Sequence, residues 1–371
     1  MTHDSVPSTH PANLLGIDYL QAAAAFGPPP VPITDVHTHI SGATASGLYK
    51  KAAEAWGIQS CCSMTQLEQV ETVADVLGDM VRFIAIPSFA NPDRRTAHGP
   101  DFLDRIRSFH ALGSRIVKFW AAPRGVDYGD EIGDPDLLRL DSPLRRDAMD
   151  LAASLDMMFM VHVADPDTWF TTKYQDAQRY GTKAWQYESL ERLLDLYPVP
   201  WIAAHFGGWP EDLDVLDGLL SRHANLHLDT SATKWMVREL SRHDSETFQA
   251  FLRKWSGRIL FGSDIVTSDD HLQADPEGTE MTSKAASLDE AFDLYASRYW
   301  ALRHLFESNY DGPSPIADPD LAMVDPDQHG PLDSPRLHGH GLPRELLEML
   351  YSEAAIKLGL NNTPNQASSA S

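Results

Sequence analysis

The feature that most limits the fold of this chain is a regular alternation of short apolar runs with amphipathic stretches. Apolar runs of strand length recur eight times, at residues 33–39, 58–64, 82–89, 115–121, 157–164, 200–207, 226–231 and 258–265. Stretches with the spacing of a one-sided helix separate them, at residues 47–56, 67–79, 101–112, 142–156, 184–197, 211–222 and 247–255. Strands that alternate with helices favour parallel pairing, because a helix is the usual connection between parallel neighbours.

Eight strand–helix units over about 250 residues match the size of a closed (β/α)8 TIM barrel. The runs are apolar almost throughout, as expected for strands that helices cover from outside. The sequence therefore predicts an α/β fold of the TIM-barrel type. A doubly wound open sheet is the competing architecture.

The remaining segments are assigned by composition and helical spacing. Residues 1–30 are predicted to form an N-terminal arm, because no Lys or Arg precedes their apolar stretch and Asp18 interrupts it, unlike a signal peptide. The barrel domain is predicted to span 31–360, with a long insertion at about 268–342 that contains a helix over 288–308 and an otherwise irregular segment over 309–341. The helical spacing of residues 342–359 predicts a closing helix. The composition of residues 361–371 predicts a disordered tail.

Charge and cysteine content narrow the setting in which this chain works. The formal net charge of −23 disfavours nucleic acid as a partner, because an acidic surface repels phosphate groups. No apolar run is long enough to cross a bilayer, so no membrane partner is expected. The two cysteines, Cys61 and Cys62, are adjacent and close no useful disulfide loop, which favours a reducing, cytoplasmic compartment.

Two histidines end the first apolar run, "ITDVHTH". His37 and His39 are two residues apart, so in a strand they project to the same side. Spacing alone does not decide their role, because 16 histidines in 371 residues give on the order of one H-x-H pair by chance. The second such pair, His338 and His340, lies in a Pro- and Gly-rich segment that is predicted to be a loop without a metal.

Further polar residues stand where other apolar runs stop. In a barrel, the C-terminal ends of the strands surround one mouth, where active sites of this fold lie. Each residue also has a structural interpretation: a single His at a strand end is more often structural than a ligand, Lys118 could pair with a carboxylate, and Asp264 could cap a turn. Together they favour a site for a divalent ion, zinc first and manganese or iron next, that activates water. The set is His37, His39, Lys118, His162, His205 and Asp264.

The segments "TDVHTH", "MVHVA", "IAAHFGG" and "LFGSD", in this order, resemble the amidohydrolase superfamily. The nearest branch is the amidohydrolase-2 group, which includes aminocarboxymuconate-semialdehyde decarboxylase and related hydrolases and lactonases. The resemblance covers residues 31–267 and 343–360. It departs from the branch in the closing helix, where Ser352-Glu353 stands in place of the usual Gly-Asn.

The resemblance implies a metal site and roles for its residues. One metal ion is implied on His37, His39, His162 and Asp264, with Asp264 moving protons and His205 acting beside the water or substrate. In two-metal members a carbamylated lysine at the position of Lys118 bridges the ions, and His162 with His205 could hold the second. The branch generally uses one metal ion. A homodimer is also implied, although no interface can be identified in the sequence.

The resulting hypothesis is a metal-dependent hydrolase that acts with a metal-activated water on a small, cyclic or carboxylated molecule. A carboxy-lyase or hydratase on the same scaffold is the alternative, and a non-catalytic binding barrel is a second one. The sequence gives weak indications of substrate contacts, since an aromatic ring could stack on a planar ligand and a cation could bind a carboxylate. Barrel packing or an ordinary surface position would explain the same residues. They are Trp120, Arg124, Lys234 and Arg298, with Asp165 and Trp169 at the mouth.

Overall fold

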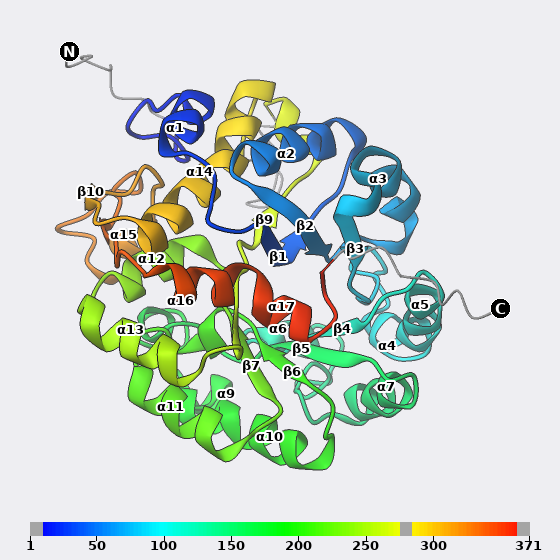
Figure 1. The fold of residues 1–371 in the computed structure, drawn as a ribbon. Coiled ribbons are helices and arrows are strands. Elements are labelled where there is room, and N and C mark those ends of the chain that lie inside the picture. The colour runs from blue at the N-terminus through cyan, green and yellow to red at the C-terminus, as the bar shows by residue number, and fades with distance from the viewer. Residues whose placement is uncertain (1–9, 275–283, 362–371) are drawn as a thin grey trace.

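The computed structural model describes residues 10–274 and 284–361. Short parallel strands lie at the centre and helices surround them, which gives an α/β fold (Figure 1). Two parallel sheets have the strand orders β3-β2-β1-β9 and β4-β5-β6-β7-β8. The strands are β1 (Ile33–His39), β2 (Ile58–Ser63), β3 (Val81–Phe83), β4 (Ile116–Trp120), β5 (Met158–His162), β6 (Trp201–Ala203), β7 (Leu226–Asp229), β8 (Ile259–Leu260) and β9 (Ile265–Val266).

Each predicted apolar run contains a strand, but most of the strands are shorter than the runs. The run at 258–265 is divided into β8 and β9, since Asp264 has a positive φ of 60° that a continuous strand does not adopt. The run at 82–89 contributes β3 and one isolated bridge between Ala85 and Val117. The strands therefore end earlier than predicted, and polar residues follow them in turns.

Backbone hydrogen bonds also involve residues near the edges of the two sheets. At one edge, the Lys118 N–H donates to the carbonyl of Ala85, and the Ala85 N–H donates to that of Ile116, both at 2.9 Å. Beside β9, in the same sheet as β1, the Asp264 N–H donates to the His37 carbonyl at 2.8 Å. The second connection holds Asp264 beside the histidines of β1.

Helices cover the strands, and their bounds agree broadly with the predicted amphipathic stretches. Ser142 occupies the N-cap position of α7, but its hydroxyl donates to the Leu137 carbonyl at 2.9 Å and does not cap the helix. The helices before the insertion are α1 (Tyr19–Phe26), α2 (Ala43–Ala55), α3 (Val70–Leu77), α4 (Arg94–His98), α5 (Pro100–Ala111), α6 (Gly125–Asp130), α7 (Pro143–Ser154), α8 (Asp167–Phe170), α9 (Ala177–Tyr180), α10 (Lys183–Leu196), α11 (Leu213–Arg222), α12 (Thr233–Leu240) and α13 (Ser245–Lys254).

The segment after β9 is more regular than its composition predicts. The predicted helix over 288–308 is confirmed as α14 (Leu288–Glu307). Within 309–341, an antiparallel pair of strands and a short helix form, namely β10 (Asp311–Pro313), β11 (Arg336–His338) and α15 (Asp320–Val324). The prediction that His338 lies in a loop is wrong, because this residue ends β11.

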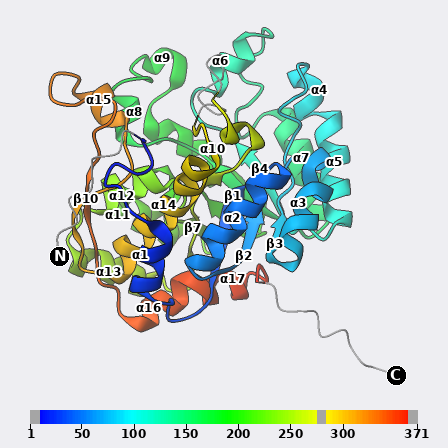
Figure 2. The same cartoon turned by 90° about the horizontal axis from the view of Figure 1, so that it is seen from above.

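The closing segment lies at one end of the strands, and the N-terminal segment is attached to the insertion. The predicted helix at 342–359 is divided into α16 (Arg344–Glu348) and α17 (Ala354–Lys357) by a π-helical turn. The view in Figure 2 places α16 and α17 at one end of the strands and α6, α9 and α15 at the other. Near the N-terminus, Leu14 donates its N–H to the Pro315 carbonyl at 2.9 Å, which attaches this segment to the insertion. The predicted tail lies almost entirely outside the described residues.

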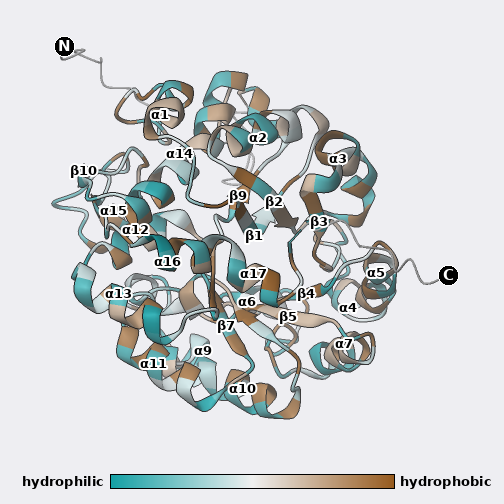
Figure 3. Cartoon of the chain, viewed as in Figure 1, coloured by the Kyte–Doolittle hydropathy of each residue, from teal (hydrophilic) through white to brown (hydrophobic). Residues whose placement is uncertain are grey.

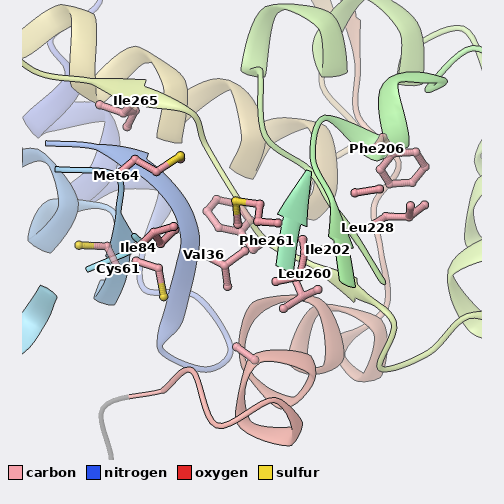
Figure 4. Packing of buried hydrophobic residues seen from close by; sticks show 14 of the residues in the cluster. Val36, Cys61, Met64, Ile84, Ile202, Phe206, Leu228, Leu260, Phe261 and Ile265 are labelled. Atoms are coloured by element: carbon pink, nitrogen blue, oxygen red, sulfur yellow. The ribbon is translucent and has the colours of Figure 1, made fainter. Parts of the chain in front are cut away.

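The space between the two sheets is filled by apolar side chains. Val36, Ile202, Leu260 and Phe261 lie together there, and none is exposed (Figure 4). The helices carry hydrophobic and hydrophilic positions along their lengths, as one-sided burial requires (Figure 3). The interior is therefore a packed core, and ligands must bind at its ends. Among the described residues, no helix is long and apolar enough to cross a membrane.

Candidate metal centre

Two histidines at the end of β1 lie beside one carboxylate, which comes from the segment between β8 and β9. The His37 ring is buried, whereas the His39 side chain is 33% exposed. Oδ1 of Asp264 lies 3.4 Å from Nε2 of His37 and 3.2 Å from Nε2 of His39. Donors about 2.0–2.2 Å from a zinc ion at tetrahedral angles lie about 3.3–3.5 Å apart. The two measured distances therefore fit ligands of one tetrahedral ion.

The position of Asp264 depends on its unusual backbone conformation and on the buried carboxylate of Asp35. Asp264 is a non-glycine residue in the left-handed region. The preceding residue, Ser263, is fixed by Asp35, which accepts its N–H at 3.0 Å and its hydroxyl at 2.5 Å. Asp35 also accepts the N–H of His37 at 3.1 Å. One carboxylate thus fixes the backbone on both sides of the site.

The charge state of Asp264 suits a ligand or a proton acceptor. Burial raises the pKa of this carboxyl, but a hydrogen bond from His39 and the nearby rings of His37 and His205 outweigh burial and hold the pKa well below its usual value. Asp264 is therefore ionised at neutral pH and accepts hydrogen bonds.

A residue that the sequence analysis did not single out, Asp229, orients His37. Its Oδ2 lies 2.8 Å from Nδ1 of His37, and the carboxylate is fully buried at the end of β7. An ionised carboxylate only accepts hydrogen bonds, so Nδ1 of His37 carries the proton and Nε2 keeps a lone pair for a metal. The rule that selected Asp264, a carboxylate at the end of an apolar run, would also have selected Asp229.

The other oxygen of Asp229 organises His205. Oδ1 accepts the N–H of His205 at 3.0 Å, the N–H of Ser231 at 3.0 Å and the Ser231 hydroxyl. Since the hydroxyl proton is donated to Asp229, Oγ of Ser231 must accept from Nδ1 of His205, 2.8 Å away. Nε2 of His205 therefore carries a lone pair. His205 itself has a positive φ of 59°, so the strained backbone after β6 contributes to its orientation.

His162 lies beside His205 and is held by a different carboxylate. Nε2 of His162 lies 2.8 Å from Oδ1 of Asp165, whose Oδ2 accepts the Tyr174 hydroxyl at 2.7 Å. Nδ1 of His162 faces Nε2 of His205 at 3.1 Å. Within the described residues, the groups that could hold a metal are His37 with His39 and Asp264, and His37 with His205 and Asp229, and neither includes His162.

Lys118 reaches the same site from β4. Its Nζ lies 3.4 Å from Nε2 of His37, and the side chain is buried. Burial lowers the pKa of Lys118 to about 8, although Asp229 and Asp264 oppose this change. Among residues 10–274 and 284–361, Lys118 forms no ion pair with a carboxylate, so the interpretation of this residue as one half of a salt bridge is not supported.

These residues form the floor of a cavity of about 620 Å³. Three tryptophans and five cationic side chains line it, against two carboxylates. A positive cavity in a chain with a formal net charge of −23 attracts anions. The tryptophans are Trp120, Trp169 and Trp235, the cations are Lys118, Lys173, Lys234, Lys284 and Arg298, and the acids are Asp264 and Asp320.

The predicted substrate residues fall into two groups. Trp120, Lys234 and Arg298 line the cavity, and Nη1 of Arg298 donates to the Ser297 hydroxyl at 2.9 Å. Arg124 is exposed, lies over the Tyr128 ring and is not among the residues that line this cavity. Trp169, expected at the mouth, also lines it.

Comparison with known proteins gives distant structural similarities. No family model matches the chain, and no curated protein matches it. The chain is similar to 2,6-dihydroxybenzoate decarboxylase from Rhizobium, with 16% identity over 71% of this chain and 98% of that chain and a TM-score of 0.40. It is also similar to a probable 2-pyrone-4,6-dicarboxylic acid hydrolase from Acinetobacter baumannii, with 11% identity over 79% and 99% of the chains and a TM-score of 0.40.

A third similar structure is 5-carboxyvanillate decarboxylase from Novosphingobium aromaticivorans, complexed with manganese. The identity is 13%, over 73% of this chain and 90% of that chain, with a TM-score of 0.31. The three similar structures are thus two decarboxylases and a probable hydrolase.

Proposed function

We propose that this chain is a metal-dependent enzyme of the amidohydrolase type, and that its two sheets form the predicted closed barrel. One divalent ion would be held by His37, His39 and Asp264, with zinc first and manganese or iron next. The observation that carries this proposal is the spacing of 3.4 and 3.2 Å between Oδ1 of Asp264 and the two Nε2 atoms. Asp229 supports it by keeping the lone pair of His37 on Nε2.

His162 remains the predicted fourth ligand, and a second ion remains an alternative. Asp165 holds the Nε2 proton of His162, and Ser231 holds the Nδ1 proton of His205. The two facing nitrogens would then both present lone pairs, 3.1 Å apart. A proton or a cation between them would remove the repulsion, which supports a second site with Lys118 as its carbamylated bridge.

A divalent ion bound here would polarise a substrate oxygen and lower the pKa of a water molecule toward neutrality. Ionised Asp264 would accept a proton on its other carboxylate oxygen, Oδ2, and pass it to the leaving group. His205 would orient the nucleophile by accepting a hydrogen bond at Nε2, because its Nδ1 donates to Ser231. This tautomer favours the orienting role over stabilisation of an oxyanion, which needs a donor.

The substrate proposed for this cavity is a small anion with a flat ring. Lys173, Lys234, Lys284 and Arg298 line the cavity and would bind carboxylates, while Trp120 offers an aromatic face. Arg124 is kept as a weaker candidate, although it does not line the cavity. The cationic lining also supports the alternative of a carboxy-lyase, since such an enzyme requires a carboxylate that the site can hold while Asp264 or His205 protonates carbon.

Two measurements test these proposals. Metal-free protein would be reloaded with Zn²⁺ and analysed for bound metal, with His39→Asn as the site variant. His338→Asn, at the other H-x-H pair, is the matched control. We expect one equivalent of bound zinc in the wild type and in the control, and less than one in His39→Asn. Less than about a tenth of an equivalent in the wild type would exclude the metal site and favour a non-catalytic barrel.

The reaction class would be decided by incubating the zinc-loaded protein with aromatic carboxylic acids and lactones. Release of carbon dioxide identifies a decarboxylase, whereas ring opening without it identifies a hydrolase. If no acid or lactone gives either product, the proposed substrate class is contradicted.

The proposed domain limits stay as predicted. The free, buried thiols of Cys61 and Cys62 are consistent with the proposed reducing, cytoplasmic compartment.

A further inference from the structure

A carboxylate from the insertion binds two of the tryptophans that line the cavity. Oδ2 of Asp320 accepts the indole N–H of Trp169 at 2.8 Å and that of Trp235 at 3.2 Å. Trp169 lies on α8 after β5, Trp235 lies on α12 after β7, and Asp320 begins α15. Residues from three distant parts of the chain therefore meet at one carboxylate oxygen.

Trp235 stands against the candidate metal centre, and Trp169 packs on Trp235. The ring centroid of Trp235 lies 5.5 Å from that of His205 and 6.3 Å from that of His162. Trp169 packs on Trp235 with centroids 5.5 Å apart and planes at 78°. The two rings therefore form an aromatic wall beside the catalytic group His205.

This wall also carries a positive charge. Nζ of Lys173 lies 3.5 Å from the centroid of the Trp169 ring, within the range of a cation–π contact. Lys173, Trp169 and Trp235 all line the cavity. A bound ring that packs against the wall would thus find an ammonium group for an anionic substituent.

Asp320 is itself held by a buried ion cluster. Nη1 of Arg238 lies 3.2 Å from Oδ2 of Asp320 and also binds Asp318, while Nη2 donates to the Thr168 hydroxyl at 3.2 Å. The Arg238 side chain is 7% exposed and that of Asp318 is 1% exposed. Arg238 therefore ties the insertion to both α8 and α12. Asp318 and Asp320 share this arginine, but only Asp320 binds the indoles.

We propose that Asp320 is a positioning residue that fixes Trp169 and Trp235 as a rigid wall, so that the cavity selects flat aromatic anions over flexible aliphatic ones. The inference rests on the proposed function, since it assumes that an anionic substrate enters this cavity. The physical reason is preorganisation: an indole whose N–H is bound keeps one orientation, and a ring that packs on it does not have to order it.

The first test follows the indole hydrogen bonds in the ligand-free protein. Indole ¹H–¹⁵N resonances of Trp169 and Trp235 would be assigned with Trp169→Phe and Trp235→Phe. In Asp320→Asn both resonances should move to the positions of weakly bonded indoles, and in the matched control Asp318→Asn they should stay. Unchanged resonances in Asp320→Asn, or equal changes in both variants, would overturn the inference.

The second test measures selectivity with two dianions, isophthalate as the flat probe and glutarate as the flexible one. Calorimetry on the zinc-loaded wild type should give tighter binding of isophthalate. Loss of a hydrogen bond that orders the wall should weaken isophthalate about tenfold in Asp320→Asn. Glutarate binding, and both affinities in Asp318→Asn, should change less than about twofold.

The outcomes separate this inference from the proposed function. A wild type that binds neither dianion contradicts the proposed substrate class and the inference with it. If the wild type prefers isophthalate and the Asp320→Asn variant keeps that preference, the inference is overturned but the proposed function is not. Should Asp320→Asn fail to fold, Trp235→Phe replaces it, since it removes one N–H and leaves the Arg238 cluster intact. The preference of Trp235→Phe for isophthalate over glutarate should then be smaller than that of the wild type. An unchanged preference would contradict the inference that the aromatic wall sets the selectivity.

Discussion

Substitution of Asp229 by asparagine should weaken zinc binding although Asp229 is not a proposed ligand. Oδ1 of Asp229 faces three donors, from His205 N, Ser231 N and Ser231 Oγ, whereas Oδ2 faces only Nδ1 of His37. An asparagine at this position has one acceptor, which the three donors would claim. Its amide NH₂ would then face Nδ1 of His37.

That arrangement reverses the tautomer of His37. Nδ1 would have to accept, so the proton moves to Nε2 and the lone pair that faces Asp264 is lost. Loss of partners that orient metal-bound histidines typically costs 10–100-fold in metal affinity, and we expect about 100-fold here, or about 2.7 kcal/mol. The affinity of metal-free protein for Zn²⁺ would be measured in competition with a chromophoric chelator.

Asp165→Asn is the matched comparison, because Asp165 holds His162 at the same distance of 2.8 Å. If His37, His39 and Asp264 are the dominant ligands, this variant should change zinc affinity less than about threefold. Equal losses in the two variants would show that His162 belongs to the ligand set. An Asp229→Asn variant with the affinity of the wild type would refute the tautomer argument.

Three further predictions follow from the site and the core. Asp264→Asn should abolish turnover while the thermal melt stays cooperative, and unimpaired turnover would contradict its role in proton transfer. His98 is buried and burial lowers its pKa to about 3, so its folded state resists protonation and stability is lost as pH falls below about 6.5. Between pH 7 and pH 5, the free energy of unfolding in urea should therefore fall by about 2 kcal/mol less in His98→Leu than in the wild type. An identical fall in the two proteins would contradict this prediction. Phe159 is fully buried with its ring centroid 4.8 Å from that of Trp201, and Phe159→Ala should lower the free energy of unfolding by about 3–5 kcal/mol. A change below about 1 kcal/mol in urea unfolding would show that the core is not packed there.

The insertion illustrates what composition cannot predict. Its many Pro, Asp and Gly residues favour irregular structure, yet it forms the β10–β11 pair and places Asp320 against two indoles. Neither the pairing nor the partner of Asp320 has a periodic pattern in the sequence. The two indole partners of Asp320 lie 85 and 151 residues away along the chain, and local propensity does not encode such contacts.

Within the site, Asp229 and His162 show what the sequence could not predict. The placement of polar residues at the ends of apolar runs predicted where each side chain emerges, because a strand of known direction fixes that position. The direction of each ring, and therefore the nitrogen that faces the metal, follows from its hydrogen-bond partner, which lies on another strand for His37 and in the following loop for His162. Asp229 on β7 decides it for His37, and Asp165 decides it for His162.

The sequence by itself determined the alternation of strands and helices and the convergence of histidines and Asp264, since both follow from local periodicity and strand direction. Tertiary structure alone decided which donor atoms meet and which side chains enclose the cavity. The physical reason is that a hydrogen bond to a buried carboxylate selects a tautomer and a rotamer only after distant segments have packed together.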